Sequence, residues 1–505
     1  MKILMIYPAP KFPIETPLTI PTGTLAVTSF LHSKGHDVLL FDRRIEWKKD
    51  LSKIITDFSP DLVGITIFSA CNLRDGVECA KTAQGLGVKT CFGGPHATAI
   101  YKELLQEGGG DFVGIGEGEY TTLELLEAVA GKRSVESVKG IAYKDKDGVV
   151  HLNEPRELAD LADFPQINFE LVDIPKYLMP RYGFKKVIDY NTAKGCPYAC
   201  TFCSSKSIHR RRYRKRPTEM LLAEIKILVT EYGVDFFSFC DEMFGANKEE
   251  LWDFCSRLKA LNLKFSWICQ TCIGHLNAED MAMMKDAGCF VIGFGIESGS
   301  PEILKQINKN YDPKLLKSHV ENLKKSGMTS SSFYIFGFPG ETTQQCRQTI
   351  HVHFRVNSRW GVYSIFQALP GTESYKELCE QGKIPFERSL ADHFADDDDE
   401  RLPNYSNMPT KDLLVILRFF QWHSSFLNRS SEGFTLVNVG RALRNLYTLI
   451  FGHGFINGVV AFYRAIKLFL HVFWYSHAYP SIRKKYDLDV KNFGRNDWDD
   501  LPSWE

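Results

Sequence analysis

Short apolar runs alternate with longer segments that carry apolar residues at helical spacing through the N-terminal part of the chain. Alternation of this kind is typical of parallel strands joined by crossover helices. The pattern predicts strands at residues 3–7, 38–41, 62–68, 88–92 and 112–115, and helices between them, such as 22–33, 75–85 and 97–107. Residues 1–137 are therefore expected to form a doubly wound, Rossmann-like α/β domain.

Glycines and polar residues gather where three of these expected strands end. Ligands of open parallel sheets bind at the carboxyl ends of the strands, and glycine lets the backbone approach a flat ligand closely. The candidate binding residues are Ser69, Gly93, Gly94, His96, Gly116 and Glu117. Taken alone, the glycines are equally consistent with tight turns.

Residues 138–181 predict a hairpin followed by a linker. Two short strands, at residues 140–143 and 149–152, flank an Asp147-Gly148 turn, which suits a two-strand hairpin. Several prolines between residues 155 and 180 exclude long helices and central strands, so this stretch is expected to pack as a linker between two domains.

A second alternating series, over residues 182–385, supplies six strand–helix units, fewer than the eight of a closed TIM barrel. The expected strands are residues 186–191, 235–240, 264–269, 289–296, 329–336 and 362–367. Polar or glycine residues follow three of them: Asp241, Glu242, Glu297, Ser298 and Gly337. Carboxylates buried at such positions usually hold a polar group, because an unpaired one is costly. The other interpretation is that each position stabilises the start of a helix, as Glu341 could.

Three cysteines, Cys196, Cys200 and Cys203, share one short loop after the first strand of this series. Three thiolates from one loop can bind three irons of a cubane iron–sulfur cluster and leave the fourth iron open. The alternatives are buried cysteines or a zinc site, for which His209 is a possible fourth ligand.

Composition limits the remaining interpretations. The chain has 505 residues, enough for about three domains, and 61 basic residues balance 61 acidic ones. This balance does not favour a nucleic-acid partner. Thirteen cysteines, an odd number, with no secretory leader do not form a disulfide framework, and a reducing cytoplasm is expected.

Two further motifs can each be interpreted in more than one way. The basic run at residues 209–216 could recognise a phosphate or an anionic substrate, or be a solvated loop. Cys269 and Cys272 form a second C-x2-C motif, which could hold a metal but lacks a partner pair, so ordinary buried cysteines are favoured.

Residues 386–505 predict a helical C-terminal region. An acidic run at 396–400 precedes an expected helix at 413–427, and a strongly apolar stretch covers residues 443–479. Residues 446–463 contain no Lys, Arg, Asp or Glu, which is marginal for a membrane-spanning helix of about 20 residues. An interfacial hairpin, a lid over an apolar substrate and a buried helical subdomain all remain open.

The C-x3-C-x2-C motif resembles the signature of radical S-adenosylmethionine (SAM) enzymes, and the first domain resembles the cobalamin-binding domain of one large subfamily. The resemblance covers about four-fifths of the chain, including the 21–25 and 34–38 segments. It implies an open six-unit barrel, a [4Fe–4S] cluster on Cys196, Cys200 and Cys203, SAM at the open iron, and cobalamin at the strand ends of the first domain.

The resemblance also implies roles for individual residues. The Asp241-Glu242 loop would approach the SAM amino group, Glu297 and Ser298 the ribose, and the Gly337 segment the adenine. The Asp-x-His-x-x-Gly motif that supplies a cobalt ligand in many cobalamin domains does not occur in the sequence, so a base-off cobalamin is expected. His96, in a different loop, is more readily a polar loop histidine than a cobalt ligand.

The implied chemistry is cleavage of SAM to a 5′-deoxyadenosyl radical and methylation of an unactivated carbon of an apolar, lipid-like or natural-product substrate. The alternative is an oxidative cyclase of the magnesium-protoporphyrin ester type, and a non-catalytic cobalamin or cluster sensor is the alternative of another class. A methylthiotransferase is disfavoured because Cys71, Cys79 and Cys91 do not cluster. An external electron donor such as flavodoxin or ferredoxin and peripheral membrane contact through the C-terminal region are the expected partners. No catalytic residue is assigned.

Overall fold

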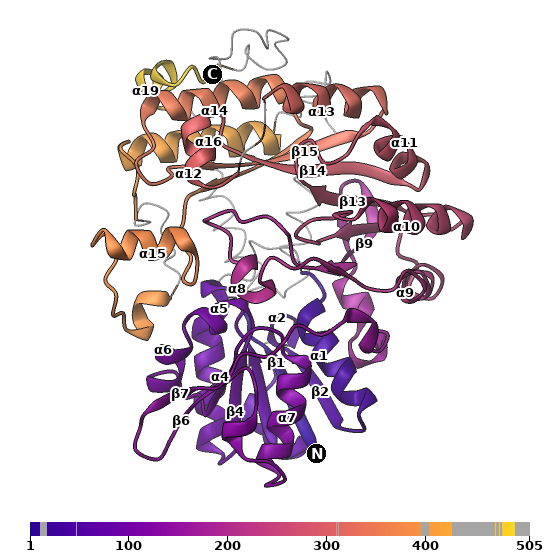
Figure 1. Ribbon diagram of the computed structural model, residues 1–505, viewed down its shortest axis with the longest axis vertical. Coiled ribbons are helices and arrows are strands. Elements are labelled where there is room, and N and C mark those ends of the chain that lie inside the picture. Colours follow the sequence, from indigo (N-terminus) through magenta and orange to yellow (C-terminus); the bar gives the residue numbers. More distant parts are fainter. Residues whose placement is uncertain are drawn as a thin grey trace. The chain divides into compact units, whose positions relative to one another are not determined.

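The computed structural model describes residues 1–10, 18–46, 48–309, 311, 313–394, 403–426, 470, 474 and 477–489. The chain divides into two compact units, and Figure 1 labels many of their helices and strands. The first unit contains residues 1–267 and 368–395, and the second contains residues 268–367 and 396–505. Most of the apolar C-terminal stretch, for which a membrane contact is predicted, lies outside the described residues.

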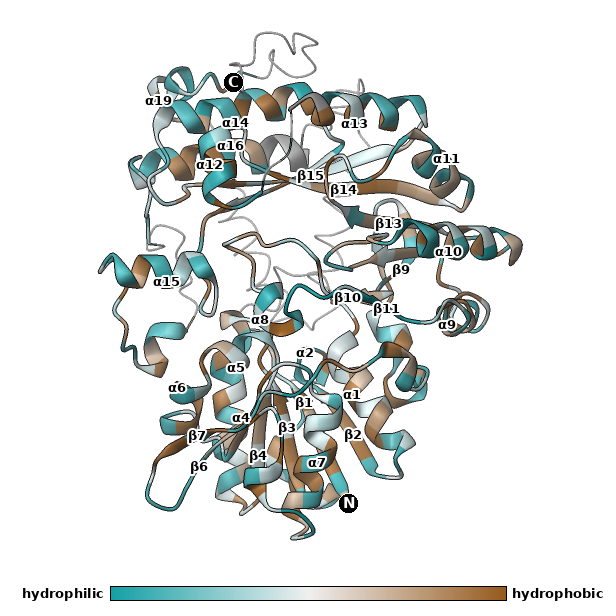
Figure 2. Cartoon of the chain, in the orientation of Figure 1, coloured by the Kyte–Doolittle hydropathy of each residue, from teal (hydrophilic) through white to brown (hydrophobic). Residues whose placement is uncertain are grey.

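A seven-stranded sheet with the strand order β2-β1-β3-β4-β5-β6-β7 forms the N-terminal half of the first unit. Strands β1 to β5 pair in parallel, and their interior positions are strongly hydrophobic (Figure 2). The strands are β1 (Lys2–Tyr7), β2 (Asp37–Asp42), β3 (Leu62–Thr66), β4 (Lys89–Gly93), β5 (Phe112–Gly114), β6 (Ile141–Lys144) and β7 (Val150–Leu152). The doubly wound fold predicted from the apolar runs is confirmed.

Helices cover both faces of this sheet, because each face carries its own apolar core. One core joins the sheet to α3, α4, α5 and α6, and the other joins it to α1 and α7. The helices are α1 (Thr22–Ser33), α2 (Arg43–Glu46), α3 (Leu51–Phe58), α4 (Leu73–Gly85), α5 (Pro95–Ala99), α6 (Tyr101–Gln106) and α7 (Glu119–Val129). The sequence predicts one helix over 97–107, but the chain breaks at Ile100, whose backbone leaves helical geometry while its side chain stays buried.

The predicted hairpin is present and extends the first sheet. Strand β6 pairs antiparallel with β5, and β7 pairs antiparallel with β6. The following linker contains short 3-10 turns rather than long elements, as its prolines require: η3 (Leu161–Asp163), η4 (Phe169–Leu171) and η5 (Ile174–Tyr177).

The first unit also contains the beginning of the second strand–helix series. Strand β9 pairs in parallel with β12 and antiparallel with β8, and a two-residue ribbon of β10 and β11 lies between them in sequence. The elements are β8 (Met179–Arg181), β9 (Phe184–Tyr190), β10 (Ala193–Lys194), α8 (Ser205–His209), β11 (Arg214–Lys215), α9 (Thr218–Thr230), β12 (Phe236–Phe239) and α10 (Lys248–Ala260). The segment 368–395, with α15 (Glu373–Glu380) and η6 (Leu390–His393), returns to this unit.

The second unit continues the series, and the division between the units falls within β13 (Ser266–Thr271). Strands β14, β15 and β16 pair in parallel. Its elements are α11 (Ala278–Asp286), β14 (Cys289–Glu297), α12 (Pro301–Gln306), α13 (Pro313–Lys325), β15 (Thr329–Phe336), α14 (Thr343–Val356), β16 (Trp360–Ile365), α16 (Thr410–Phe426) and α19 (Pro480–Lys485). The six strands β9 and β12–β16 are the six predicted units, and the α/β fold class with a partial barrel is confirmed.

Helix α16 packs on the outer side of the second unit's strands. The Phe420 ring stacks on Phe336 and Tyr363 and meets the edge of His353 from α14. Among the described residues, no helix has the length and apolar character needed to cross a membrane.

Candidate functional site

The three-cysteine loop is closed at its base by the β10–β11 ribbon. Ala193 pairs with Lys215 and Lys194 with Arg214, so residues 195–213 form one loop. Within it, the Cys203 amide donates to the Cys200 carbonyl at 3.2 Å, which forms a tight turn between two of the cysteines. Cys196 and Cys200 are partly exposed and Cys203 is exposed, as thiols that meet a bound group would be.

Gly195 fixes the path of the chain into Cys196. Its φ is +86°, and a Cβ at this position would lie 2.2 Å from the Arg212 carbonyl oxygen and 2.9 Å from the His209 Cβ. Any side chain here would force the two ends of the loop apart. A glycine is therefore required directly before the first cysteine.

A second support for the cysteine loop comes from α15, far along the sequence. The Ser374 amide donates to the Thr201 carbonyl at 3.0 Å, and the Ser374 hydroxyl donates to the Thr201 hydroxyl at 2.9 Å. Thr201 lies between Cys200 and Cys203. Sequence reasoning missed this contact, because 173 residues separate the two partners and neither belongs to a motif.

Asp241, which directly follows β12 and Cys240, holds the entry to the same loop. Its carboxylate accepts hydrogen bonds from the Thr192 amide at 2.7 Å, from the Ala193 amide at 3.2 Å, and from the Thr192 hydroxyl. Burial raises the pKa of Asp241 to about 7. The printed contacts place this carboxylate against the backbone that leads to Cys196, and a SAM contact stays a prediction.

His209 joins two loops that the sequence places at different strand ends. Its Nδ1 lies 3.1 Å from Glu117 Oε1, and its Nε2 lies 3.2 Å from Glu242 Oε1. Glu242 also accepts from the Gly195 amide at 3.1 Å. The candidate cobalamin loop after β5 and the candidate SAM loop after β12 are thus bridged by one imidazole. A zinc-ligand role for His209 does not fit, because both ring nitrogens face carboxylates.

Buried charges around Glu117 keep this bridge ionised. Burial alone would raise the pKa of Glu117, but hydrogen bonds and charges from His209, Lys194 and Arg214 bring it down to about 2. Burial would likewise lower the pKa of His209, and its bonds to Glu117 and Glu242 outweigh that and raise it. The Lys194 ammonium lies 2.6 Å from Glu119. The two carboxylates therefore favour the protonated imidazolium form of His209.

The carboxyl edge of the first sheet suits a flat ligand. A Cβ on Gly93 or Gly116 would contact no described atom within 4 Å, so the backbone is open on that side. Gly94 has a φ of +99°, and a Cβ there would lie 2.8 Å from the Ile67 carbonyl oxygen, so only glycine allows this close approach of two strand ends. Phe68 is 61% exposed at the same edge, next to Ser69. These features fit a cobalamin macrocycle.

His96 faces a second histidine. The rings of His96 and His393 lie 6.2 Å apart, and His96 Nε2 is buried with no hydrogen-bond partner among the described residues. Burial, and then the neighbouring His393, lower the pKa of His96 to about 4. His96 is therefore neutral at pH 7 and packs against η6, while its role toward cobalamin stays a prediction.

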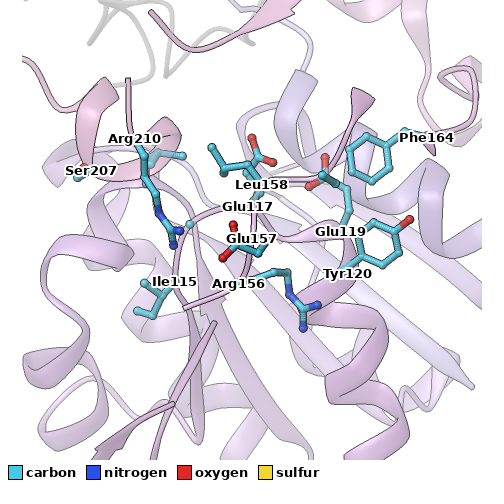
Figure 3. Close-up of a pocket in the computed structure, with 13 residues that line it drawn as sticks. Ile115, Glu117, Glu119, Tyr120, Arg156, Glu157, Leu158, Phe164, Ser207 and Arg210 are labelled. Atoms are coloured by element: carbon cyan, nitrogen blue, oxygen red, sulfur yellow. The ribbon is translucent and has the colours of Figure 1, made fainter. Parts of the chain in front are cut away.

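A small hollow lies beside the Glu117 loop. It has a volume of about 40 Å³, far too small for a corrin ring, and Arg210 and Tyr120 lie on opposite sides of it (Figure 3). Arg156 at its wall is bound to Glu124 by two hydrogen bonds, at 2.9 and 2.6 Å. The hollow suits ordered water that solvates the buried charges, not a cofactor.

The second unit carries the other predicted SAM residues. Glu297, at a bulge with a φ of +61°, pairs with Lys309 at 2.7 Å. Ser298 is fully buried, and its hydroxyl lies 3.1 Å from the Thr349 hydroxyl of α14. The ribose contacts predicted for Glu297 and Ser298 are not tested by these bonds and stay predictions.

Gly337 begins a loop that Glu341 closes. The Glu341 carboxylate accepts from the Gly337 amide at 2.5 Å and from the Phe338 amide at 3.2 Å. Its other oxygen has no hydrogen-bond partner among the described residues. Burial raises the pKa of Glu341 to about 8. The side chain therefore braces the predicted adenine loop as a neutral carboxylic acid at pH 7.

Replacing Glu341 with glutamine should remove a pH-dependent loss of stability. The folded protein keeps a proton on Glu341 that the unfolded chain releases above its ordinary pKa of about 4.5, so wild-type stability falls as pH rises toward 8. Glutamine accepts the same bonds without titrating. We expect E341Q to match the stability of wild type at pH 5. At pH 8.5 its melting temperature should be higher, by about 2–4 °C for each ~1 kcal/mol of stability gained.

Thermal unfolding from pH 5 to 9 checks this, with E302Q as the control. Glu302 is an exposed carboxylate in the first turn of α12 and accepts from the Ser300 hydroxyl at 2.6 Å, and its pKa is lowered, not raised. An E341Q advantage that is equal at all pH values would contradict a protonated Glu341.

The alternative metal interpretations gain no support. Among the described residues, no three His, Cys, Asp or Glu side chains are already gathered closely enough to hold a metal ion. Cys269 is buried in β13, as an ordinary core cysteine would be. The fit of the cysteine loop to a cluster therefore rests on its donor set, three thiols in one short loop.

Both halves of this arrangement match known family models. The model "B12 binding domain" matches residues 17–126, and the model "Radical SAM superfamily" matches residues 190–352. The fold and site thus define a radical SAM enzyme with a cobalamin-binding domain. A [4Fe–4S] cluster, SAM and cobalamin are its cofactors.

Relatives place the chain more narrowly. An uncharacterized methyltransferase of Pyrococcus horikoshii is 33% identical over 384 residues, which cover 74% of this chain and 83% of that protein. An anaerobic magnesium-protoporphyrin IX monomethyl ester cyclase of Rubrivivax gelatinosus is 26% identical over 72% of this chain and 67% of that protein. The chain belongs to the cobalamin-dependent radical SAM methyltransferase family.

The fold is also that of a solved protein structure. The cobalamin-dependent SAM radical enzyme OxsB, with aqua-cobalamin and SAM bound, aligns with a TM-score of 0.69 at 14% identity, over 99% of this chain and 77% of that one. At this identity the likeness supports the architecture alone. It agrees with the order of cobalamin domain, partial barrel and helical C-terminal region.

Proposed function

We propose that this enzyme methylates an unactivated carbon of an apolar, lipid-like or natural-product substrate. The observation that carries the proposal is the His209 bridge, in which the Glu117 loop of the cobalamin domain and the Glu242 loop of the barrel share one imidazole. Methyl transfer to a radical carbon needs both cofactors at one site. A chain that only stored cobalamin would have no need to tie these two loops together.

The cofactors supply a 5′-deoxyadenosyl radical and a methyl group when bound, and the chain positions them. In this proposal Cys196, Cys200 and Cys203 bind the cluster, and Ser69, Gly93, Gly94, Gly116 and Glu117 line the cobalamin edge. The proposed SAM residues are Asp241 and Glu242 in the first unit, and Glu297, Ser298 and Gly337 in the second. The glycines leave room for flat groups, and the buried carboxylates fix the loops.

The inner face of the second unit supports an apolar substrate. Tyr334 and Tyr363 lie on the side of β15 and β16 that α14 and α16 cover. Strand side chains alternate, so Phe333, Ile335 and Val362 lie on the opposite face, and Val362 is 46% exposed. Phe333, Ile335 and Val362 form an apolar part of this face, which also carries Ser331 and Ser364, and this apolar part suits a hydrocarbon substrate better than a charged one.

The second candidate is oxidative cyclisation. The similarity to the Rubrivivax gelatinosus cyclase, which covers 67% of that protein, favours this reaction. A cyclase would remove hydrogen from its substrate and transfer no methyl group.

An anaerobic assay separates the two. The protein is reconstituted with iron, sulfide and cobalamin, and SAM and a reductant are added. S-adenosylhomocysteine that accompanies 5′-deoxyadenosine supports methyl transfer, and 5′-deoxyadenosine alone supports cyclisation. The C203A variant should give neither product because it removes one of three predicted cluster ligands. A preparation that retains no cobalamin would contradict the proposal.

A further inference from the structure

The basic run at residues 209–216 divides into two groups with different surroundings. His209, Arg214 and Arg216 turn inward and pair with carboxylates. Arg210, Arg211 and Arg212 are exposed and form no ion pair with a described carboxylate. The cysteine loop thus carries three exposed arginines outside the buried ion pairs, of which Arg210 also lines the small hollow.

These three arginines stand on an unusually fixed backbone. Arg210 and Arg211 have φ values of +49° and +60°, a left-handed conformation that non-glycine residues rarely adopt. The Arg210 amide donates to the Lys206 carbonyl at 2.9 Å, and the Arg212 amide donates to the His209 carbonyl at 2.8 Å. The turn is further packed against Gly195. These bonds fix the backbone from which the three exposed side chains extend.

The turn lies next to the predicted cluster ligands. Gly195, which the Arg212 carbonyl covers, directly precedes Cys196. Arg211 Nε donates to the Pro197 carbonyl at 3.4 Å, and Tyr198, the next residue, is 46% exposed. A protein that docks on this turn would therefore approach the cysteine loop from solvent.

We propose that Arg210, Arg211 and Arg212 form the docking surface for a small acidic one-electron carrier protein. This inference rests on the proposed function, which requires a reduced cluster. In this step the carrier loses one electron and the cluster gains it, so the step needs no other reactant. Since the whole chain has no net charge, a local cluster of three positive charges is what would orient an acidic carrier.

The test uses charge reversal at two of the three positions. R211E/R212E leaves Arg210 in place, because Arg210 also lines the small hollow. K132E/K146E is the matched control, since it makes the same charge change at exposed positions of the cobalamin domain and its hairpin. Each full-length reconstituted protein is assayed with reduced flavodoxin and with reduced methyl viologen, a small cationic donor that needs no docking surface. Flavodoxin affinity is measured separately by titration.

R211E/R212E should weaken flavodoxin binding and lower flavodoxin-driven 5′-deoxyadenosine formation about tenfold at low ionic strength. The difference should shrink at about 0.5 M salt. Viologen-driven rates should fall much less than flavodoxin-driven rates, since the only printed contact of the two side chains with the cysteine motif is the bond from Arg211 to the Pro197 carbonyl. Equal flavodoxin affinities for R211E/R212E and K132E/K146E would overturn the docking surface. An equal loss with both donors would also overturn it, and would assign these arginines to the cysteine loop itself. Failure of wild type to cleave SAM with viologen would count against the proposed function, while the affinity comparison still decides the docking surface.

Discussion

Replacing His209 with phenylalanine should lower methyl transfer about 100-fold, because displacement of a reacting group by about 1 Å can cost that much. Phenylalanine keeps the ring but donates to neither Glu117 nor Glu242. Glu117 would keep Arg214, whereas Glu242 would keep, among the described residues, its bond from the Gly195 amide. The direct bridge between the two loops would then be lost, and they would stay linked only indirectly, through Arg214 and Gly195 at the base of the cysteine loop. SAM cleavage should fall less than methyl transfer, so more 5′-deoxyadenosine should form per methylated product.

Single-turnover assays that quantify both products check this result. H209Q, which can donate to one carboxylate, should show an intermediate ratio. H151F is the matched control, since His151 lies 2.6 Å from Asp145 at the hairpin, in the same unit, and should leave both rates unchanged. Equal losses of SAM cleavage and methyl transfer in H209F would show that His209 supports only the cysteine loop. Cobalamin content, read from the absorption spectrum, confirms that the first domain is intact.

The ratio of the two products should also depend on pH through His209. The folded-state pKa of His209 is raised above its ordinary value of about 6.5, so the stabilisation by the imidazolium is complete below pH 6.5. It is lost as pH rises through the folded-state pKa. The amount of methylated product per 5′-deoxyadenosine should therefore fall toward alkaline pH in wild type and stay constant in H209Q.

What the sequence could predict was local. The three cysteines lie within eight residues, and their spacing alone indicates ligands of an iron–sulfur cluster. Apolar runs located β1 to β5 and β15 because each buried strand needs an unbroken apolar segment. The glycines at the edge of the first sheet could also be identified, because a strand end and the turn that follows it are adjacent in sequence.

What the sequence could not predict depends on partners that are distant along the chain. From the sequence, His209 is a possible zinc ligand; only the fold shows its two carboxylates, of which Glu117 lies 92 residues before it. The basic run gave no sign of which arginines turn inward, because Glu117 and Glu224 belong to different elements. Strand-end carboxylates predicted to meet SAM, such as Asp241, also brace backbone amides, and only the fold reveals those bonds.

Replacing Glu224 with glutamine should destabilise the first unit by about 3–5 kcal/mol, since it leaves the Arg216 charge buried without a counter-charge. Glu224 is fully buried in α9 and accepts from Arg216 Nη1 at 2.8 Å, from the Ile167 amide at 2.7 Å and from the Tyr190 hydroxyl. Tyr190 ends β9, and Arg216 follows β11, so one carboxylate joins the linker to both ends of the cysteine loop. Anaerobic thermal and urea unfolding of the full chain measure the loss.

Glu219 provides the matched control on the same helix. Its bond to Arg257, at 2.7 Å, is exposed to solvent, so E219Q should leave the unfolding midpoint nearly unchanged. The double variant R216M/E224Q should be more stable than E224Q, because removing both members of a buried pair leaves no unpaired charge. A double variant no more stable than E224Q would mean that Glu224 acts through Ile167 and Tyr190 and not through Arg216. The cysteine loop would then depend on hydrogen bonding to the linker, and its cluster content should fall in E224Q even where the chain stays folded.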